Sequence, residues 1–183
     1  MTDDDKPGTS VNTPQNGASE DNMDIKKAKN TSIAIHAQYV KDISFENPNA
    51  PQTLKADQQR PNMDININLD AKKIDDPNIP DLYEVSLMLT ASAKNDELTF
   101  FIIEISYGIL ASLSDIPEAN HHPLLLIEVP KLGFPYVRQI LSNLTAQGGY
   151  PPLLINPVDF DTMYMDQFGK KNQPSADKQE NNS

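Results

Sequence analysis

The chain has 183 residues, of which 38% are hydrophobic, and it carries a formal net charge of −11 and no cysteine. Its length fits one domain with tails, and its acidity disfavours nucleic acid and anionic membranes as partners, because basic surfaces bind both. The absence of cysteine excludes disulfides, thiol catalysis and thiolate zinc sites in this chain.

Both ends of the chain are poor in hydrophobic residues. Residues 1–32 contain Val11, Met23 and Ile25 as their sizeable hydrophobic side chains, and residues 169–183 contain none. Such segments cannot bury enough apolar surface to offset the loss of backbone entropy on folding. The composition therefore predicts a disordered N-terminal tail over 1–32, a folded domain over 33–168 and a disordered C-terminal tail over 169–183.

The sequence shows no membrane or export signal. No apolar run approaches the roughly 20 residues that are needed to cross a bilayer. The N-terminus lacks the apolar core of a signal peptide. We therefore expect a soluble, cytoplasmic protein without direct membrane insertion.

Four segments have the alternating pattern of β-strands, at residues 35–46, 63–74, 82–93 and 97–110. Lys94-Asn95-Asp96 is a turn signal that predicts an antiparallel hairpin between the third and fourth strands. The fourth strand has apolar residues on both faces, with Phe100 expected beside Ile102 and Glu104. This strand is predicted to be covered on both sides or to meet another subunit.

The first strand carries an acidic line of side chains. Strict alternation places Val40, Asp42, Ser44 and Glu46 on one face, and Tyr39, Lys41, Ile43 and Phe45 on the other. Asn47-Pro48 ends the strand. The acidic face is either a surface for display to a partner or an ordinary solvated face.

Helical spacing begins after the strands. Apolar residues recur from Phe134 to Leu144, and Gly148-Gly149 sits where a helix C-cap belongs. Residues 122–129 are either an earlier helical piece or a buried connector. Asn156 is predicted to be the N-cap of a second helix, with Pro157 at its first position. The expected fold is α+β, a four-stranded antiparallel sheet followed by two helices.

Several segments together resemble the SecB family of protein-export chaperones. They are residues 39–51, 134–138, 148–153 and 156–161, in the family's order and at its spacings, and the resemblance covers roughly 35–168. It implies a homotetramer built as a dimer of dimers. It also implies an ATP-independent cytoplasmic holdase that binds unfolded preproteins, keeps them translocation-competent and delivers them to the ATPase SecA.

The resemblance also assigns a docking site for SecA, through its zinc-binding C-terminal tail. This role falls on Asp42, Glu46, Ile102 and Glu104, which lie close together if the first and fourth strands are neighbours. The zinc would belong to the partner. An acidic patch around an apolar spot suits a basic or metal-bearing peptide, and binding there should weaken with salt.

A second surface is apolar and rich in methionine and aromatic residues, which suit promiscuous binding because they repack easily. We expect part of this surface to form one groove for unfolded clients, although the same residues could equally form the core between helices and sheet. These residues are Met63, Ile65, Ile67, Leu153, Ile155, Met163, Tyr164 and Phe168.

The sequence offers no catalytic residues. It has no Gly-x-Ser-x-Gly motif, no phosphate-binding glycine pattern and only three histidines, of which His121-His122 is predicted to form a polar turn before Pro123. We therefore expect neither an enzyme nor a bound cofactor or metal. The alternative to a chaperone is an adaptor that recruits one basic partner through the acidic face. The choice between general export and a specialised relay stays open.

Overall fold

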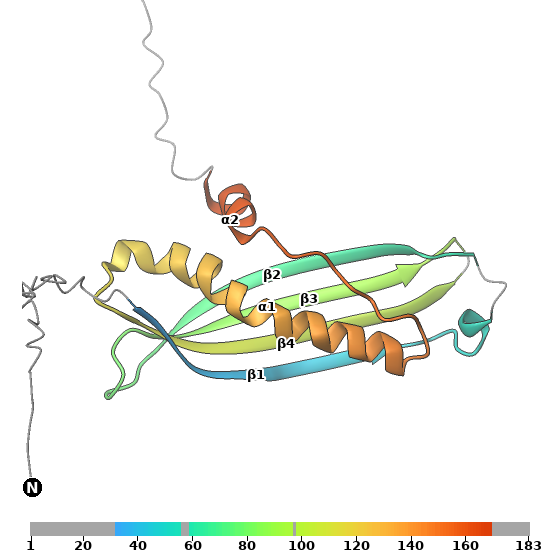
Figure 1. Ribbon diagram of the computed structural model, residues 1–183, viewed down its shortest axis with the longest axis horizontal. Helices are drawn as coiled ribbons and strands as arrows, with labels where there is room; N and C mark the ends of the chain where they lie inside the picture. The colour runs from blue at the N-terminus through green and yellow to red at the C-terminus, as the bar shows by residue number, and fades with distance from the viewer. Residues whose placement is uncertain (1–31, 56–58, 97, 170–183) are drawn as a thin grey trace, which may run out of the picture.

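The computed structural model describes residues 32–55, 59–96 and 98–169 (Figure 1). Strands β1 (Ser32–Glu46), β2 (Asn62–Ile74), β3 (Leu82–Lys94) and β4 (Thr99–Ser114) precede helices α1 (His121–Gln147) and α2 (Phe160–Phe168). Two short 3-10 helices, η1 (Gln52–Leu54) and η2 (Glu118–Asn120), lie in the connections. The α+β fold expected from the sequence is therefore confirmed. The predicted tails lie outside the described residues, except that Ser32 already begins β1 and Gly169 caps α2.

The four strands form one antiparallel sheet in the order β1-β4-β3-β2. The predicted β3–β4 hairpin is confirmed, since Asn95 N donates to Leu98 O at 3.0 Å and Leu98 N donates to Asn95 Oδ1 at 2.7 Å. Strand β4 runs on to Ser114, beyond its predicted end, because its far end pairs with the start of β1 at Ser32. This extension lengthens the sheet at the end where α1 begins.

Helix α1 and the connector that follows it lie across one face of the sheet (Figure 1). The core forms between them: Val129, Val137 and Leu141 of α1 are fully buried against β3 and β4. The odd-numbered residues of β3 from Tyr83 to Ala93 are all buried on this side, as alternation requires. No described helix packs on the opposite face, which we call the outer face.

Strand β1 does not keep strict alternation. Its pairing with β4 shifts register between Ile35 and Ala37 and again between Val40 and Asp42. At each shift β1 carries one residue more than its partner, as in a β-bulge. An extra residue moves every side chain beyond it to the opposite face, because side chains alternate with period two.

The second bulge overturns part of the predicted facial arrangement of β1. Val40 lies opposite Tyr107, which stacks on Tyr136 of α1, so Val40 lies on the helix side and not with Asp42. Tyr39 and Lys41 both contact Glu84 on the outer face. Beyond the bulge, Asp42 and Glu46 lie on the opposite face of the sheet from Ile43 and Phe45, as predicted.

Residues 122–129 belong to α1, which is one continuous helix that includes Pro130 and Pro135. Gly148 is its C-cap, as predicted, and Gly148 N donates to Leu144 O at 2.9 Å. The predicted polar turn at His121-His122 is wrong. His121 is the first residue of α1 and is buried, with Nδ1 at 2.9 Å from the Tyr83 hydroxyl and Nε2 at 2.9 Å from Ile116 O.

The second helix begins later than predicted. Its N-cap is Asp159, whose Oδ1 accepts a hydrogen bond from Thr162 N at 3.0 Å, so the prediction of Asn156 as N-cap is wrong. Residues 151–159 form an extended connector instead. The residue before a proline disfavours helical backbone angles, which keeps Asn156 extended before Pro157. Hydrogen bonds to Thr162 hold the pKa of Asp159 below its ordinary value.

Gly133 lets α1 approach the sheet closely. A Cβ at this position would lie 2.4 Å from Ile109 Cδ1, and Ile109 is fully buried. Overpacking of this kind costs about 1–3 kcal/mol, while alanine gains about 1 kcal/mol of helix propensity over glycine. We expect Gly133→Ala to lower the free energy of unfolding by about 1–2 kcal/mol, measured by urea denaturation.

The matched variant is Ile109→Val, which removes the Cδ1 atom that the new methyl group would meet. The double variant should lose less free energy of unfolding than the two single variants lose together, because the collision is relieved. Additive effects would show that the glycine is not needed for this approach.

Candidate functional site

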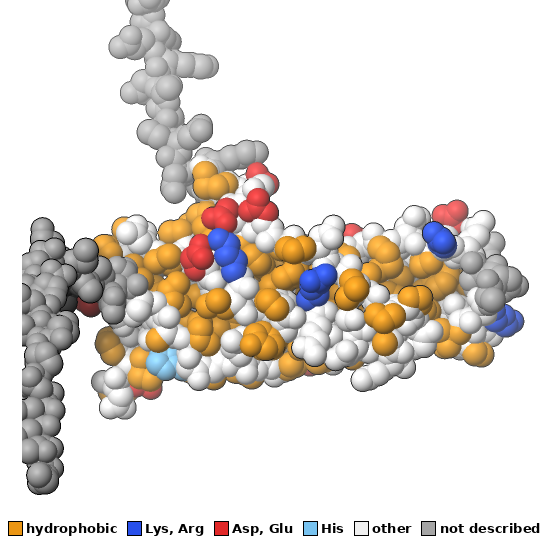
Figure 2. Space-filling model, viewed as in Figure 1, with side chains coloured by type: hydrophobic (Ala, Val, Ile, Leu, Met, Phe, Trp, Pro, Cys, Tyr) orange, Lys and Arg blue, Asp and Glu red, His pale blue; other side chains and the backbone are white. Residues whose placement is uncertain are grey.

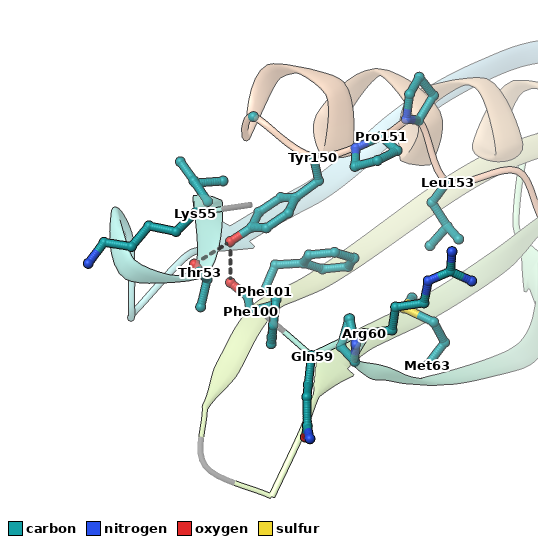
Figure 3. Close-up of a pocket in the computed structure, with 14 residues that line it drawn as sticks. Thr53, Lys55, Gln59, Arg60, Met63, Phe100, Phe101, Tyr150, Pro151 and Leu153 are labelled. Carbon is teal, nitrogen blue, oxygen red and sulfur yellow. Dashed lines mark hydrogen bonds between the residues drawn. The ribbon is translucent and has the colours of Figure 1, made fainter. Parts of the chain in front are cut away.

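A pocket of about 600 Å³ opens beside the end of α1, on the helix side of the sheet (Figure 3). Four segments that are distant in sequence line it. They are residues 53–55 around η1, residues 59–61 before β2 with Met63 near its start, residues 100–101 of β4, and residues 149–153 after α1. No aspartate or glutamate lines the pocket. It can therefore receive an apolar group without placing that group beside a carboxylate.

Aromatic rings form much of the pocket wall. Tyr150 lies with its ring centroid 6.3 Å from that of Phe100 and 5.1 Å from that of Phe101. Both phenylalanines reach the pocket because the β3–β4 pairing shifts register between Ala93 and Lys94. Phe100 is therefore beside Phe101 at the pocket and not with Glu104, which corrects the alternation expected for this strand.

The Tyr150 hydroxyl joins three parts of the chain. It lies 2.8 Å from Thr53 Oγ1 and 2.9 Å from Phe100 O (Figure 3). It also lies 2.8 Å from Asn47 Oδ1. Thr53 can donate to this oxygen while the Tyr150 proton goes to Asn47 or Phe100. These bonds hold the loop after β1 against β4 and the connector, so the pocket is formed without a ligand.

Of the eight residues expected to line one client groove, the structure brings Met63 and Leu153 together in this pocket. Ile65 and Ile67 continue along β2 from Met63, and Ile65 is 38% exposed. Ile155 is buried in the core. Of the two connector residues in this prediction, Leu153 therefore lines the pocket and Ile155 lies in the core.

The three groove residues of α2 lie elsewhere. Tyr164 and Phe168 pack on His122 at the start of α1, with ring centroids 5.5 and 4.9 Å from that of the imidazole. The Tyr164 hydroxyl is 2.8 Å from His122 Nδ1, and Met163 packs against the core. The pocket lies at the other end of α1 (Figure 1). These eight residues therefore do not line one pocket within this chain, because the extended connector carries α2 back along α1, and their role in client binding stays a prediction.

Several pocket residues were not singled out from the sequence. Tyr150 had a signal, since it lies in the segment Gly148-Gly149-Tyr150 that carried part of the family resemblance. Phe100 and Phe101 appeared only as ordinary strand residues. No sequence pattern marked Thr53 and Arg60 as pocket residues, because tertiary packing alone brings them to the pocket at Tyr150.

The outer face carries the predicted acidic patch. Strand β1 pairs with β4, so that Glu46 lies opposite Ile102, Ser44 opposite Glu104 and Asp42 opposite Ser106. Asp42, Glu46 and Glu104 are exposed, whereas Ile102 is half-buried. Asp42 and Glu104 also line a shallow hollow of about 250 Å³ together with Met88, which is 39% exposed. The geometry thus gathers three carboxylates around apolar side chains.

The charge of a neighbouring carboxylate on the outer face, Glu84, is compensated by a lysine. Lys41 Nζ lies 2.8 Å from Glu84 Oε2, and the Tyr39 hydroxyl donates to Glu84 Oε1. These hydrogen bonds hold the pKa of Glu84 below its ordinary value, while the bond to Glu84 raises the pKa of Tyr39. The uncompensated negative charge of β1 and β4 is therefore concentrated at Asp42, Glu46 and Glu104.

The helix-bearing face exposes hydrophobic side chains along its length (Figure 2). On α1, Leu132 and Tyr136 are 50% and 51% exposed, and Leu154 in the connector is 66% exposed. Exposed apolar patches on a soluble domain commonly mark interaction surfaces.

None of the described helices is long and apolar enough to cross a membrane. Across residues 32–55, 59–96 and 98–169, no group of three or more histidine, aspartate or glutamate side chains is arranged to hold a metal ion.

Comparison with known proteins gives a consistent picture. Residues 26–171 match the model of the SecB family, described as preprotein translocase subunit SecB. The protein-export protein SecB of Bartonella bacilliformis is 46% identical over 132 residues, covering 72% of this chain and 80% of that protein. SecB of Maricaulis maris is 41% identical over 160 residues, covering 87% and 86%.

A solved structure has the same fold. It is a SecB-like chaperone from Mycobacterium tuberculosis in complex with an antitoxin peptide, with a TM-score of 0.56 and 16% identity over 69% of this chain and 90% of that chain.

Proposed function

The chain belongs to the SecB family, and from this premise we propose that it is a chaperone in protein export. It binds preproteins in their unfolded state and keeps them competent for translocation without nucleotide hydrolysis. The relatives named above are protein-export proteins, and the solved SecB-like chaperone holds a peptide. Both facts support a role in capturing extended chains.

The observation that carries the proposal is the apolar pocket at Tyr150. Its volume of about 600 Å³ suits a large side chain with its neighbours. Burying one such side chain contributes about 1.5–3 kcal/mol. Folded proteins hide their large apolar residues, so a pocket of this kind selects unfolded chains without reading a particular sequence.

The acidic patch supports a second part of the proposal, the transfer of clients to SecA. Asp42, Glu46 and Glu104 surround Ile102 on a rigid sheet face that α1 does not cover. Such a surface complements a basic or metal-bearing peptide, in keeping with the zinc-binding tail that the family resemblance implies. The pocket lies on the helix side of the sheet, so client and SecA would bind separate surfaces.

Self-association completes the proposed assembly. The exposed Leu132, Tyr136 and Leu154, together with the long unpaired edge of β1, suit contacts with further copies of the chain. We propose a cytoplasmic homotetramer, a dimer of dimers, in which residues 33–168 form the chaperone domain between two tails. Several pockets on one particle would raise the affinity for a long client.

Calorimetric titration of a slow-folding precursor tests the proposal. The precursor is added first in its unfolded state and then folded, and heat is expected with the unfolded form alone. The fitted stoichiometry reports the oligomer. Absence of heat with both forms would contradict the chaperone role, and binding of one folded partner would favour the adaptor alternative.

The patch gives a prediction of its own. Asp42→Asn with Glu104→Gln should weaken SecA binding about tenfold, since losing close interfacial charges costs about 1.5 kcal/mol or more. Client affinity should stay unchanged, because the pocket lies on the other side of the sheet. Both affinities can be measured by calorimetry.

The matched control is Asp64→Asn with Asp70→Asn. It removes two exposed carboxylates from the outer face of β2 and changes the net charge equally. If the control weakens SecA binding as much as the patch variant does, general charge and not the patch is responsible.

A further inference from the structure

A lysine beside the acidic patch is held away from it by Glu84. Lys41 directly precedes Asp42 and is the extra residue of the second bulge in β1. Its Nζ lies 2.8 Å from Glu84 Oε2 and 3.2 Å from Ser86 Oγ, and both partners belong to β3. Because β4 lies between β1 and β3, the Lys41 side chain reaches across β4 on the outer face, away from Asp42 and Glu104.

Several contacts keep this arrangement in place. Gly108 of β4 leaves room for the Tyr39 ring, since a Cβ there would lie 2.6 Å from Tyr39 Cε2. The Tyr39 hydroxyl donates to Glu84 Oε1, so each oxygen of this carboxylate has its own donor. The Glu84 side chain is 19% exposed and that of Lys41 is 35% exposed. An ion pair within a partly buried network keeps its geometry better than an isolated surface pair does.

Without this contact, Lys41 has the acidic patch within reach. Asp42 lies opposite Ser106 of β4, and Glu104 is two residues further along that strand. Glu104 is therefore about 7 Å along and about 5 Å across from Asp42, a distance that extended lysine and glutamate side chains span together. A released ammonium group would compensate a carboxylate of the patch and repel a cationic partner.

Glu84 itself is distant from the patch. It lies opposite Leu110 of β4, so Ser106 and Glu104 are about 13 and 20 Å further along that strand. Salt screens exposed charges beyond about 8 Å at physiological ionic strength. An effect of Glu84 on binding at the patch is therefore expected to pass through Lys41.

We propose that Glu84 is a positioning residue for the docking of SecA. It holds Lys41 against β3 and so keeps the carboxylates of Asp42 and Glu104 free for a cationic partner. The inference rests on the proposed transfer of clients to SecA and adds to it a determinant outside the patch. Glu84 strengthens the binding of SecA without contacting it.

Calorimetric titration of SecA into the full chain tests the proposal. Glu84→Gln should weaken SecA binding about two- to fivefold, the range for one partly exposed ion pair. Lys41→Gln should change the affinity by less than about twofold, because the lysine is already compensated in the wild type. Glu84→Gln with Lys41→Gln should return to within about twofold of the wild-type affinity, because no cation remains to be released.

The matched control is Glu84→Gln with Lys72→Gln. Lys72 is exposed and lies opposite Glu84 on β2, the strand at the far edge of the sheet from β1. This variant has the same net charge as the first double variant but still contains Lys41, so it should bind SecA as weakly as Glu84→Gln does. Thermal melting and the affinity for an unfolded client check that the fold and the pocket are kept.

The outcomes separate the two proposals. If the wild-type chain does not bind SecA, the proposed transfer fails and the role of Glu84 fails with it. If the wild type binds SecA and Glu84→Gln binds it equally well, the transfer stands and the role of Glu84 is refuted. Recovery with Lys72→Gln as well as with Lys41→Gln would assign the effect to net charge. Recovery with neither would assign it to a direct contact of Glu84, and both results would refute the positioning role.

Discussion

Phe160→Ala is expected to lower the free energy of unfolding by about 3–5 kcal/mol, the range for removing a large aromatic side chain from a core. Phe160 is 1% exposed and meets Phe134 of α1 edge to face, with ring centroids 5.8 Å apart. It is the buried residue of α2, whose other residues are half-buried or exposed. Its loss should therefore also release α2 from α1.

Urea denaturation at one fixed protein concentration measures the effect, because oligomers are stabilised by mass action. Met165→Ala is the matched control: it also shortens a large apolar side chain of α2, but Met165 is 61% exposed. We expect its effect to stay within about 0.5 kcal/mol. Equal losses in the two variants would show that α2 is not anchored through Phe160.

Tyr150→Ala is expected to weaken client binding about 10- to 100-fold, because a client side chain loses the ring that walls the pocket and with it about 1.5–3 kcal/mol of burial. The ring packs on Phe101 and Phe100, and its hydroxyl holds Thr53 and Asn47 in place. Anisotropy with an unfolded, labelled client gives the affinity.

Tyr150→Phe separates the two roles of this side chain. It keeps the ring but leaves the buried Thr53 hydroxyl without its partner at Tyr150, which should cost about 1–3 kcal/mol of stability. Its client affinity should fall less than that of Tyr150→Ala. If both variants bind clients as the wild type does, the pocket is not the client site.

Tyr164→Ala provides a comparison at the other end of α1, where Tyr164 packs on His122 and Phe168. A smaller loss of client affinity than in Tyr150→Ala is expected, because the two tyrosines line different clusters. An equal loss would indicate that a bound client spans both ends of the helix, as the sequence had suggested for one groove.

Much of the sheet could be predicted because its signals are local. The alternation of Ile65 and Ile67 with polar residues set the faces of β2, and the Asn95 turn set the β3–β4 hairpin. The proximity of Asp42 and Glu104 followed from one assumption, the pairing of β1 with β4, which the structure confirms. The roles of these residues in binding SecA and clients remain predictions.

Other features failed to appear in the sequence because competing interactions decide them. The bulge near Lys41 depends on how β1 meets β4, and it moves Val40 to the helix side without any glycine or proline in β1 to mark it. Asn156-Pro157 has the form of a helix start, yet the connector stays extended until Asp159 can cap α2 through Thr162.

The sequence by itself determined the α+β class, the acidic patch and the family resemblance. Outside the bulges, it also determined on which face of the sheet each strand side chain lies. These depend on residues a few positions apart or on one strand pairing. Only the tertiary structure decided the pocket, since Tyr150 meets Thr53 across 97 residues and Asn47 across 103. It also separated Tyr164 from Met63. Contacts over such distances follow from how the whole chain packs, and no local periodicity encodes them.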